Sequence, residues 1–342
     1  MTDKLLYFGP QWEGSTSLQR LHAFGKVEGI KAIGIDNGSS VGVTANTWNR
    51  IRWKLRIPAD TEGENAKLIL AIESHTPTYV FVDNSKVISA KTILEARALG
   101  VRHLIYYSPD DIVSRHNLSI PLQRSLPFWD FVCTTKTFNV QELIALGVKN
   151  PILVGKAFDP LLHIPLPKDE LGSHFEAFDA VFVGTYEKER AASINSLADA
   201  GISVVVYGSD QGYWRSRVLH PRVTLRESAF GANYVRAWHT GKVGLCFLRK
   251  INRDRITQRT MEIAAMGRPM VAERTDEHDS HFLHDKEYFG FYNDVELVEG
   301  VFRLIADDSR RMQLAISGRL RCLNSGYSTV DRAKQMMSLF QR

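Results

Sequence analysis

The sequence predicts an α/β protein made of two consecutive Rossmann-like domains that face each other across a cleft. Short β-branched and aromatic runs alternate with helix-length amphipathic stretches along almost the whole chain, which is typical of parallel sheets covered by helices on both faces. The 342 residues suffice for two domains of about 150–180 residues each. A proline-rich, polar segment at 157–180 interrupts the alternation and is interpreted as the linker.

The first domain is expected to cover residues 1–165. Its predicted strands are 5–8, 30–35, 79–82, 103–107, 131–134 and 152–154. Its predicted helices include 15–24, 90–99 and 137–146. The last two helices end at Gly100 and Gly147, and a glycine directly after a helical stretch is a common helix C-terminal signal.

The second domain is expected to cover residues 166–328, followed by a closing segment, 329–342, that packs back on the first domain. Its predicted strands are 180–183, 204–207, 223–225, 243–248 and 269–272. Its predicted helices are 190–200, 233–239, 258–266, 295–306 and 310–321, with a closing helix at 329–340. The chain contains no fixed-period repeat.

Composition excludes several classes of protein. With 44% hydrophobic and 24% charged residues, the chain is neither disordered nor a coiled coil. No run approaches the roughly 18 apolar residues of a membrane-spanning helix. Cys133, Cys246 and Cys322 are far apart, so we expect reduced thiols in a cytoplasmic protein. The net charge of +5 is mild and spread over both halves, which argues against nucleic-acid binding.

The loops after the strands are the expected ligand-binding places, because parallel sheets bind ligands at the carboxyl ends of their strands. None of these loops carries the GxGxxG fingerprint or the GxxxxGK[ST] phosphate loop. The pattern therefore disfavours a nicotinamide dehydrogenase and a P-loop NTPase. Glycines after two of the strands, Gly9 and Gly184, still allow a ligand to approach the backbone closely.

The segment 243–272 carries the most informative pattern. A strand ends at Leu248, a basic loop follows, and Thr257 is a suitable N-cap for a helix that ends at Gly267. Free N–H groups at this helix start predict an anion site that fits a diphosphate, and Glu262 could accept hydrogen bonds from two ribose hydroxyls. The basic residues nearby are Arg249, Lys250, Arg253, Arg255 and Arg259. The alternative is a solvated loop before an ordinary packing helix.

Residues 252–254 (Asn-Arg-Asp) and 257–267 (Thr-Gln-Arg-Thr-Met-Glu-Ile-Ala-Ala-Met-Gly) resemble the donor-binding segment of CgeB-like glycosyltransferases, whose C-terminal domain is related to glycosyltransferase family 4. The resemblance continues through 273–278, 287–292 and 327–333. In the first half, 105–111 (Ile-Tyr-Tyr-Ser-Pro-Asp-Asp) is similar to a strand of that family that ends in an acidic pair.

This resemblance implies a GT-B fold with a nucleoside-diphosphate sugar on the C-terminal domain, the acceptor between the domains, and no required metal. Glu262 would bind the donor ribose, Arg259 and the helix start the diphosphate, and Tyr207 the base. The implied donor-binding residues are Gly184, Thr185, Arg190, Tyr207, Gly208, Asn252, Thr257, Gln258, Arg259, Thr260 and Glu262.

The chain departs from this family at one acidic position. Many retaining relatives have two glutamates separated by seven residues, and here Asp254 occupies the first position. Retention of configuration therefore does not follow from the resemblance. Asp254 is a candidate for binding a sugar hydroxyl, or it pairs with Arg253 or Arg255.

Three further carboxylates are candidate catalytic residues, because an inverting transferase needs a base for the acceptor hydroxyl. Glu13 follows the first strand and is the first choice, the alternative being a solvated loop residue. Asp110 and Asp111 follow the fourth strand and either hold the acceptor, poise a base, or cap the next helix. His22 has apolar neighbours and is interpreted as a packing residue.

Two clusters invite other interpretations. The segment 47–58 mixes tryptophans with basic residues and suits a membrane surface, a lipid-linked acceptor or nucleic acid. At helical spacing, however, Trp48, Ile51 and Leu55 predict a core stripe, which is the favoured interpretation. The histidines of the second cluster, His278, His281 and His284, lie near Asp279 and Asp285, but their spacing turns the third away from the first two, so we expect no metal site.

We therefore predict a cytoplasmic glycosyltransferase that moves a sugar from a nucleoside-diphosphate sugar to a hydroxyl of a glycan, a lipid-linked glycan or another acceptor, with peripheral contact at the inner membrane surface as one option. One alternative is a sugar-nucleotide epimerase or hydrolase, and another is a non-catalytic nucleotide-sugar-binding protein. A narrower option, suggested only by the mild positive charge, is a modifier of DNA bases or a surface-glycan enzyme.

Overall fold

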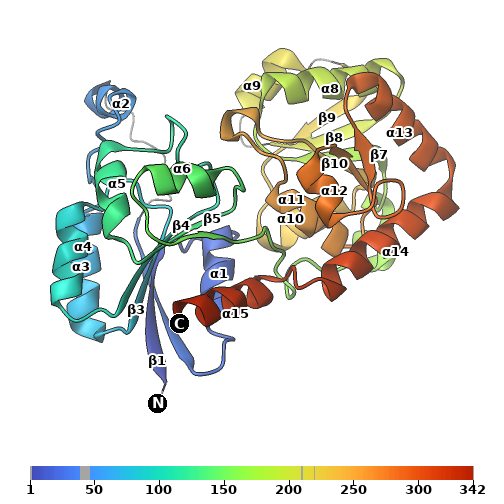
Figure 1. Cartoon of the computed structure of the whole chain (residues 1–342). Coiled ribbons are helices and arrows are strands. Elements are labelled where there is room, and N and C mark those ends of the chain that lie inside the picture. The colour runs from blue at the N-terminus through green and yellow to red at the C-terminus, as the bar shows by residue number, and fades with distance from the viewer. Residues whose placement is uncertain (1, 39–46, 209–210, 219, 342) are drawn as a thin grey trace. The chain divides into compact units, whose positions relative to one another are not determined.

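The computed structural model describes residues 2–38, 47–208, 211–218 and 220–341, and it divides into two compact units (Figure 1). Unit 1 comprises Met1–Gly155 and Thr329–Arg342, and unit 2 comprises Lys156–Ser328. The structure thus begins unit 2 ten residues earlier than the sequence analysis did. Phe158 and Leu162 explain the difference, because both pack into the core of unit 2.

Unit 1 is built on a parallel sheet of six strands in the order β2-β1-β3-β4-β5-β6. The strands are β1 (Asp3–Gly9), β2 (Ile30–Asp36), β3 (Tyr79–Asp83), β4 (His103–Ser108), β5 (Phe131–Thr134) and β6 (Pro151–Leu153). The helices are α1 (Thr16–Phe24), α2 (Thr47–Lys54), α3 (Glu64–His75), α4 (Ala90–Ala98), α5 (Ile120–Ser125), α6 (Asn139–Ala145) and α15 (Thr329–Phe340).

Alternation along β1 places apolar side chains on both faces of this sheet. Leu6 and Phe8 join the core on the face covered by α3 and α4. Leu5 and Tyr7 join the core on the opposite face, where Phe340 of α15 is also buried. The last helix of the chain therefore completes the core of unit 1.

Unit 2 holds a second parallel sheet, in the order β12-β11-β10-β7-β8-β9, which is the strand order of a Rossmann fold. The strands are β7 (Phe178–Val183), β8 (Val204–Tyr207), β9 (Val223–Arg226), β10 (Gly241–Cys246), β11 (Met270–Glu273) and β12 (Phe289–Phe291). The helices are α7 (Lys168–Leu171), α8 (Lys188–Asp199), α9 (Gln211–Arg217), α10 (Gly231–Trp238), α11 (Gln258–Ala265), α12 (Asp276–His281), α13 (Asp294–Ala306) and α14 (Asp308–Asn324).

The strand order of unit 2 reverses between β7 and β10. Connections from these two neighbouring strands run to opposite sides, so their loops separate at the carboxyl ends, which is where such sheets bind ligands. Val181 and Val183 of β7 face the core shared with α10 and α11. Ala180 and Phe182 face the core on the other side, shared with α8 and α13.

Helix α2 contradicts the prediction of a core stripe. Trp48, Ile51 and Leu55 are 61%, 43% and 61% exposed, and no residue of the helix is buried. The reason is that the cores on both faces of the sheet in unit 1 are completed by other helices. Trp53 attaches α2 to the unit instead, with Lys86 Nζ 5.2 Å from its ring centroid. Across the described residues, no helix is long and apolar enough to cross a membrane.

Candidate functional site

The carboxyl ends of β7 and β10 bring together the central residues predicted to bind the donor. Gly184 and Thr185 follow β7, and Arg259 lies in the first turn of α11, which follows the loop after β10. A Cβ atom on Gly184 would lie 2.8 Å from both Arg259 Nη2 and Phe182 Cζ. A side chain at position 184 would displace the Arg259 guanidinium or the Phe182 ring from the end of β7.

Arg190 connects the ends of the two strands from inside the unit. Its side chain is buried, and it donates from Nη1 to the carbonyl of Thr185 at 3.1 Å and from Nη2 to the carbonyl of Leu248 at 3.2 Å. Burial, together with the charge of Arg259, lowers the pKa of Arg190 to about 10, so the group stays positive at neutral pH. Arg190 thus positions both loops and adds positive charge beneath them.

Arg259 is the more accessible cation. Its Nε donates to the carbonyl of Val183 at 2.7 Å, and its guanidinium lies 5.8 Å from the ring centroid of Phe182. Within the described residues, its two terminal nitrogens have no hydrogen-bond acceptor. The side chain is therefore anchored at one end and offers N–H donors at the other, which is the arrangement an anion needs.

The first turn of α11 is closed by two threonines that cap each other. Thr257 accepts from the N–H of Thr260, and the Thr260 hydroxyl accepts from the N–H of Thr257 at 3.4 Å. Gln258 does not face a ligand, because its amide exchanges two hydrogen bonds with the backbone of Ala157. The first turn therefore offers an anion the Arg259 side chain and those backbone N–H groups that the capping box leaves over, while the side chains of Thr257, Gln258 and Thr260 serve structure.

The basic loop carries less net charge than its sequence indicates. Arg249 lies 3.3 Å from Glu187, and Lys250 pairs with Glu273. Glu187 directly follows the Gly184 loop. It was not predicted as part of the site, because only the glycine and threonine of that loop match a donor-binding pattern.

Asn252 and Asp254 shape the loop between β10 and α11. Asn252 donates to Asp254 Oδ1 at 3.0 Å, and the N–H of Arg249 donates to Asp254 Oδ2 at 3.4 Å. These bonds close the loop around Arg253, which has a left-handed φ of 46°. Contact between Asp254 and a sugar stays a prediction.

Glu262 lies one turn inside α11 and is 5% exposed. The hydroxyl of Tyr234, on α10, donates to Glu262 Oε2, and His163 Nε2 lies 3.8 Å from Glu262 Oε1. Glu262 was predicted from the sequence, but Tyr234 and His163 were not. No local pattern marks them, because both come from segments distant in the chain.

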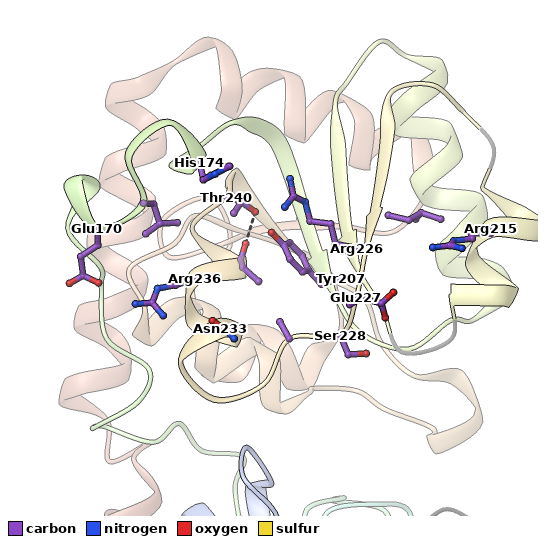
Figure 2. A pocket seen from close by; sticks show the side chains of 14 residues that line it. Glu170, His174, Tyr207, Arg215, Arg226, Glu227, Ser228, Asn233, Arg236 and Thr240 are labelled. Carbon is purple, nitrogen blue, oxygen red and sulfur yellow. Dashed lines mark hydrogen bonds between the residues drawn. The ribbon is translucent and has the colours of Figure 1, made fainter.

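A groove of about 640 Å³ lies between α10 and the ends of β8 and β9 (Figure 2). Tyr207 and Arg226 line it from the strands, with the Arg226 guanidinium 6.0 Å from the tyrosine ring centroid. Asn233 and Arg236 line it from α10. Gly208 follows Tyr207, and a Cβ there would lie 2.3 Å from the indole nitrogen of Trp214. The volume of the groove suffices for a small ring system, and its charged lining consists of three arginines and two glutamates: Arg215, Arg226, Arg236, Glu170 and Glu227.

The three candidate carboxylates of unit 1 have different surroundings. Glu13 is exposed and makes no hydrogen bond within the part of the chain that the structure describes. Asp110 is half-buried, with Oδ2 3.4 Å from the amide nitrogen of Asn84. Asp111 is fully buried, and its Oδ1 accepts from Asn139 at 2.9 Å and from the N–H groups of 113 and 114. Asp111 therefore caps the turn that follows, and not the next helix, because α5 is capped by Ser119.

Replacing Asp111 with alanine is expected to destabilise the protein by about 2–4 kcal/mol, because buried donors lose their acceptor. Asp110→Ala is the matched control, and we expect it to cost less than about 1 kcal/mol because, among the described residues, that side chain makes a single hydrogen bond, and a long one. Urea unfolding followed by tryptophan fluorescence measures both. Equal midpoints for the two variants would contradict the structural role of Asp111.

The histidine cluster serves packing. His278 is buried against Tyr288, with ring centroids 4.3 Å apart, and burial lowers the pKa of His278 to about 4. His284 Nδ1 accepts from the N–H of Gly290 at 3.0 Å. Among the residues that the structure describes, no three His, Cys, Asp or Glu side chains lie close enough together to hold a metal ion.

Comparison with known proteins agrees with this architecture. Residues 190–338 match a family model described as glycosyl transferase-like. None of the curated proteins matches the chain in sequence. Solved structures match over the whole length: Anabaena HepE in complex with UDP and glucose has 15% identity, a TM-score of 0.68 and 99% of each chain covered.

Two other solved structures give the same result. Sucrose-phosphate synthase from Thermosynechococcus elongatus has 12% identity and a TM-score of 0.66, with 99% of this chain and 98% of that chain covered. A glycosyltransferase from Rickettsia africae has 11% identity and a TM-score of 0.67, with the same coverage. The chain therefore has the GT-B fold, and the prediction of two Rossmann-like domains is confirmed. The family match is confined to the C-terminal part of the chain, residues 190–338.

Proposed function

We propose that this protein transfers a sugar from a nucleoside-diphosphate donor, bound by unit 2, to an acceptor hydroxyl. The observation that carries the proposal is the arrangement at the end of β7, where the terminal guanidinium nitrogens of Arg259, in the first turn of α11, lie beside Gly184. The glycosyl transferase-like match and the GT-B fold support it. So does the structural likeness to HepE in complex with UDP-glucose.

The donor would lie across the carboxyl ends of the strands in unit 2. Its diphosphate would occupy the start of α11, and its ribose hydroxyls would donate to Glu262. Its base would enter the groove beside Tyr207, where the aromatic ring offers a stacking surface and Asn233 offers hydrogen bonds. These placements use positions the sequence analysis selected, together with a groove that only the structure shows.

Transfer would break the bond between the sugar's anomeric carbon and the diphosphate oxygen and form a bond to the acceptor oxygen. Negative charge grows on the departing diphosphate, and Arg259 and the helix N–H groups would stabilise it without a metal ion. For a transfer with inversion, Asp110 would take the hydroxyl proton. We favour it over Glu13 because Asn84 holds the Asp110 carboxylate, whereas Glu13 is exposed.

A thermal-shift screen against UDP, GDP, dTDP, CMP and their sugars, with the corresponding nucleosides as controls, tests the proposal. One nucleoside diphosphate and its sugars are expected to raise Tm more than the corresponding nucleoside, because only they reach the anion site. The absence of a shift with every compound would contradict the proposal. Donor turnover to free sugar or an epimer without acceptor would favour an epimerase or hydrolase, and binding without turnover would favour a binding protein.

Peripheral contact with an anionic membrane surface is a further part of the proposal. Helix α2 exposes Trp48 and Ile51, and Leu55, directly after the helix, is exposed too. Arg50 and Lys54 are also exposed, and the segment 47–58 contains no acidic residue. A basic helix with exposed tryptophan and aliphatic side chains matches the chemistry of a lipid headgroup region. Such contact would suit a lipid-linked acceptor.

Vesicle co-sedimentation measures this contact. The protein is expected to sediment with vesicles of phosphatidylcholine and phosphatidylglycerol but not with phosphatidylcholine alone. Trp48→Ser combined with Leu55→Ser should abolish sedimentation, because the inserted apolar area is lost. Leu94→Ser is the matched control, since Leu94 is 50% exposed on α4. Equal binding of the double variant and the control would contradict the role of α2.

A further inference from the structure

The Glu262 carboxylate lies where three segments of unit 2 meet. Tyr234, on α10, donates its hydroxyl to Oε2, and His163, from the segment before α7, faces Oε1 with Nε2 at 3.8 Å. The two aromatic rings are nearly perpendicular, with centroids 5.9 Å apart. Burial and the nearby carboxylate hold the pKa of Tyr234 well above its usual value, so its hydroxyl stays protonated and remains a donor.

The hydrogen on the His163 ring is placed by the surrounding backbone. The N–H of Asp159 donates to His163 Nδ1 at 2.9 Å, so Nδ1 carries no hydrogen. The neutral ring therefore carries its hydrogen on Nε2, the atom that faces Glu262. The turn is closed further by a bond from the N–H of His163 to the Asp159 carbonyl, also 2.9 Å.

The segment that carries His163 is attached at both ends. Gln258 holds the backbone of Ala157, and the N–H of Leu166 donates to His239 Nε2 at 3.1 Å. The His163 ring itself is only 1% exposed. The imidazole is thus held on a fixed piece of backbone, too deeply buried to contact a ligand directly.

We infer that His163 is a positioning residue that, with Tyr234, fixes the Glu262 carboxylate for the ribose hydroxyls of the donor; this inference rests on the proposed function. At 3.8 Å the Nε2–H group orients Oε1 electrostatically without occupying a lone pair, since a direct hydrogen bond is shorter. Glu262 therefore keeps acceptor capacity on Oε1 for a hydroxyl. Ligating carboxylates are commonly oriented by such outer partners.

Two substitutions of His163 separate the positioning role from a structural one. Asparagine places Oδ1 where Nδ1 lies and keeps the bond from Asp159, but its amide does not reach Glu262. Glutamine places its Nε2 where the imidazole Nε2 lies and keeps the donor toward Glu262. His163→Asn should therefore weaken binding of the nucleotide, and His163→Gln should restore it.

Calorimetry on the full chain with UDP and GDP, each beside its 2′,3′-dideoxy analogue, tests the inference. For the nucleotide that binds, His163→Asn is expected to weaken affinity about five- to tenfold, and His163→Gln less than about twofold. The dideoxy analogue should bind the wild type and His163→Asn equally, because it has no hydroxyls for Glu262. Tyr234→Phe should give the same pattern as His163→Asn.

Unchanged affinity in His163→Asn would overturn the inference. So would an equal loss for the nucleotide and its dideoxy analogue, because that result indicates a general structural defect. If His163→Asn does not fold, Tyr234→Phe still tests whether the Glu262 carboxylate must be oriented for binding. If Glu262→Gln weakens binding of the nucleotide while His163→Asn and Tyr234→Phe do not, this inference alone fails. If Glu262→Gln also leaves binding unchanged, the ribose placement in the proposed function fails with it.

Discussion

Replacing Arg259 with alanine is expected to lower turnover about 100- to 1000-fold at saturating donor, the usual cost of removing a group that stabilises charge growing in the transition state. The wild-type guanidinium is fixed by its bond to the Val183 carbonyl and needs no reorganisation when the diphosphate departs. Binding of the donor should fall less than turnover, because the first-turn N–H groups of α11 remain. Steady-state release of the nucleoside diphosphate measures the effect.

Two companion variants sharpen this test. Arg259→Lys should recover only part of the turnover, because an ammonium restores the charge but not the fork of N–H donors. Arg303→Ala is the matched control, since Arg303 is an exposed arginine on α13 of the same unit. Near-normal turnover of Arg259→Ala with a true donor would remove the central role assigned to this side chain.

The strands of this fold could be predicted because their runs of apolar residues are buried on both faces of a parallel sheet. Strand β8, for example, was predicted at its observed bounds, 204–207. Helix α3 and strand β12 were not predicted. Strand β12 has only three residues, Phe289–Phe291, too few to show any alternation. Short elements of this kind are defined by their neighbours in the sheet and not by their own sequence.

The central residues of the site could be predicted where a local rule applies. Gly184 and Arg259 stand at a strand end and a helix start, positions that the sequence reveals and that the sheet topology brings together. The surroundings of these residues could not be predicted. Arg249 meets Glu187 from 62 positions away, and Glu262 meets His163 from 99 positions away, so no window along the chain contains both partners.

Neighbouring acidic residues and an exposed helix also show that tertiary surroundings could not be predicted from the sequence. Asp110 and Asp111 look equivalent in sequence, yet the chain buries one under three donors and leaves the other half-exposed. The apolar spacing of α2 has the period of a core helix, but a periodic pattern does not reveal whether a core surface is still available. Both distinctions depend on tertiary packing.

Replacing Glu262 with alanine is expected to weaken binding of the donor nucleotide about 100-fold. Two hydroxyls donating to one carboxylate contribute about 1.5 kcal/mol each, and the sum corresponds to two powers of ten in Kd. Calorimetry with the nucleotide selected by the thermal-shift screen measures the loss. Glu262→Gln keeps the size of the side chain and should lose nearly as much, because the bonds are strong only to the charged form.

Glu299→Ala is the control for Glu262, since Glu299 is an exposed glutamate on a helix of the same unit and should leave Kd unchanged. If only Glu262→Ala weakens nucleotide binding, the affinity depends on the Glu262 carboxylate. This group is nearly buried in unit 2, which costs free energy of solvation. The groups that face this carboxylate are two neutral donors, Tyr234 and His163. They offset its charge less fully than a cation would. Unchanged affinity in Glu262→Ala would instead mean that this arrangement serves only to join α10 and α11, and the ribose would have to bind elsewhere.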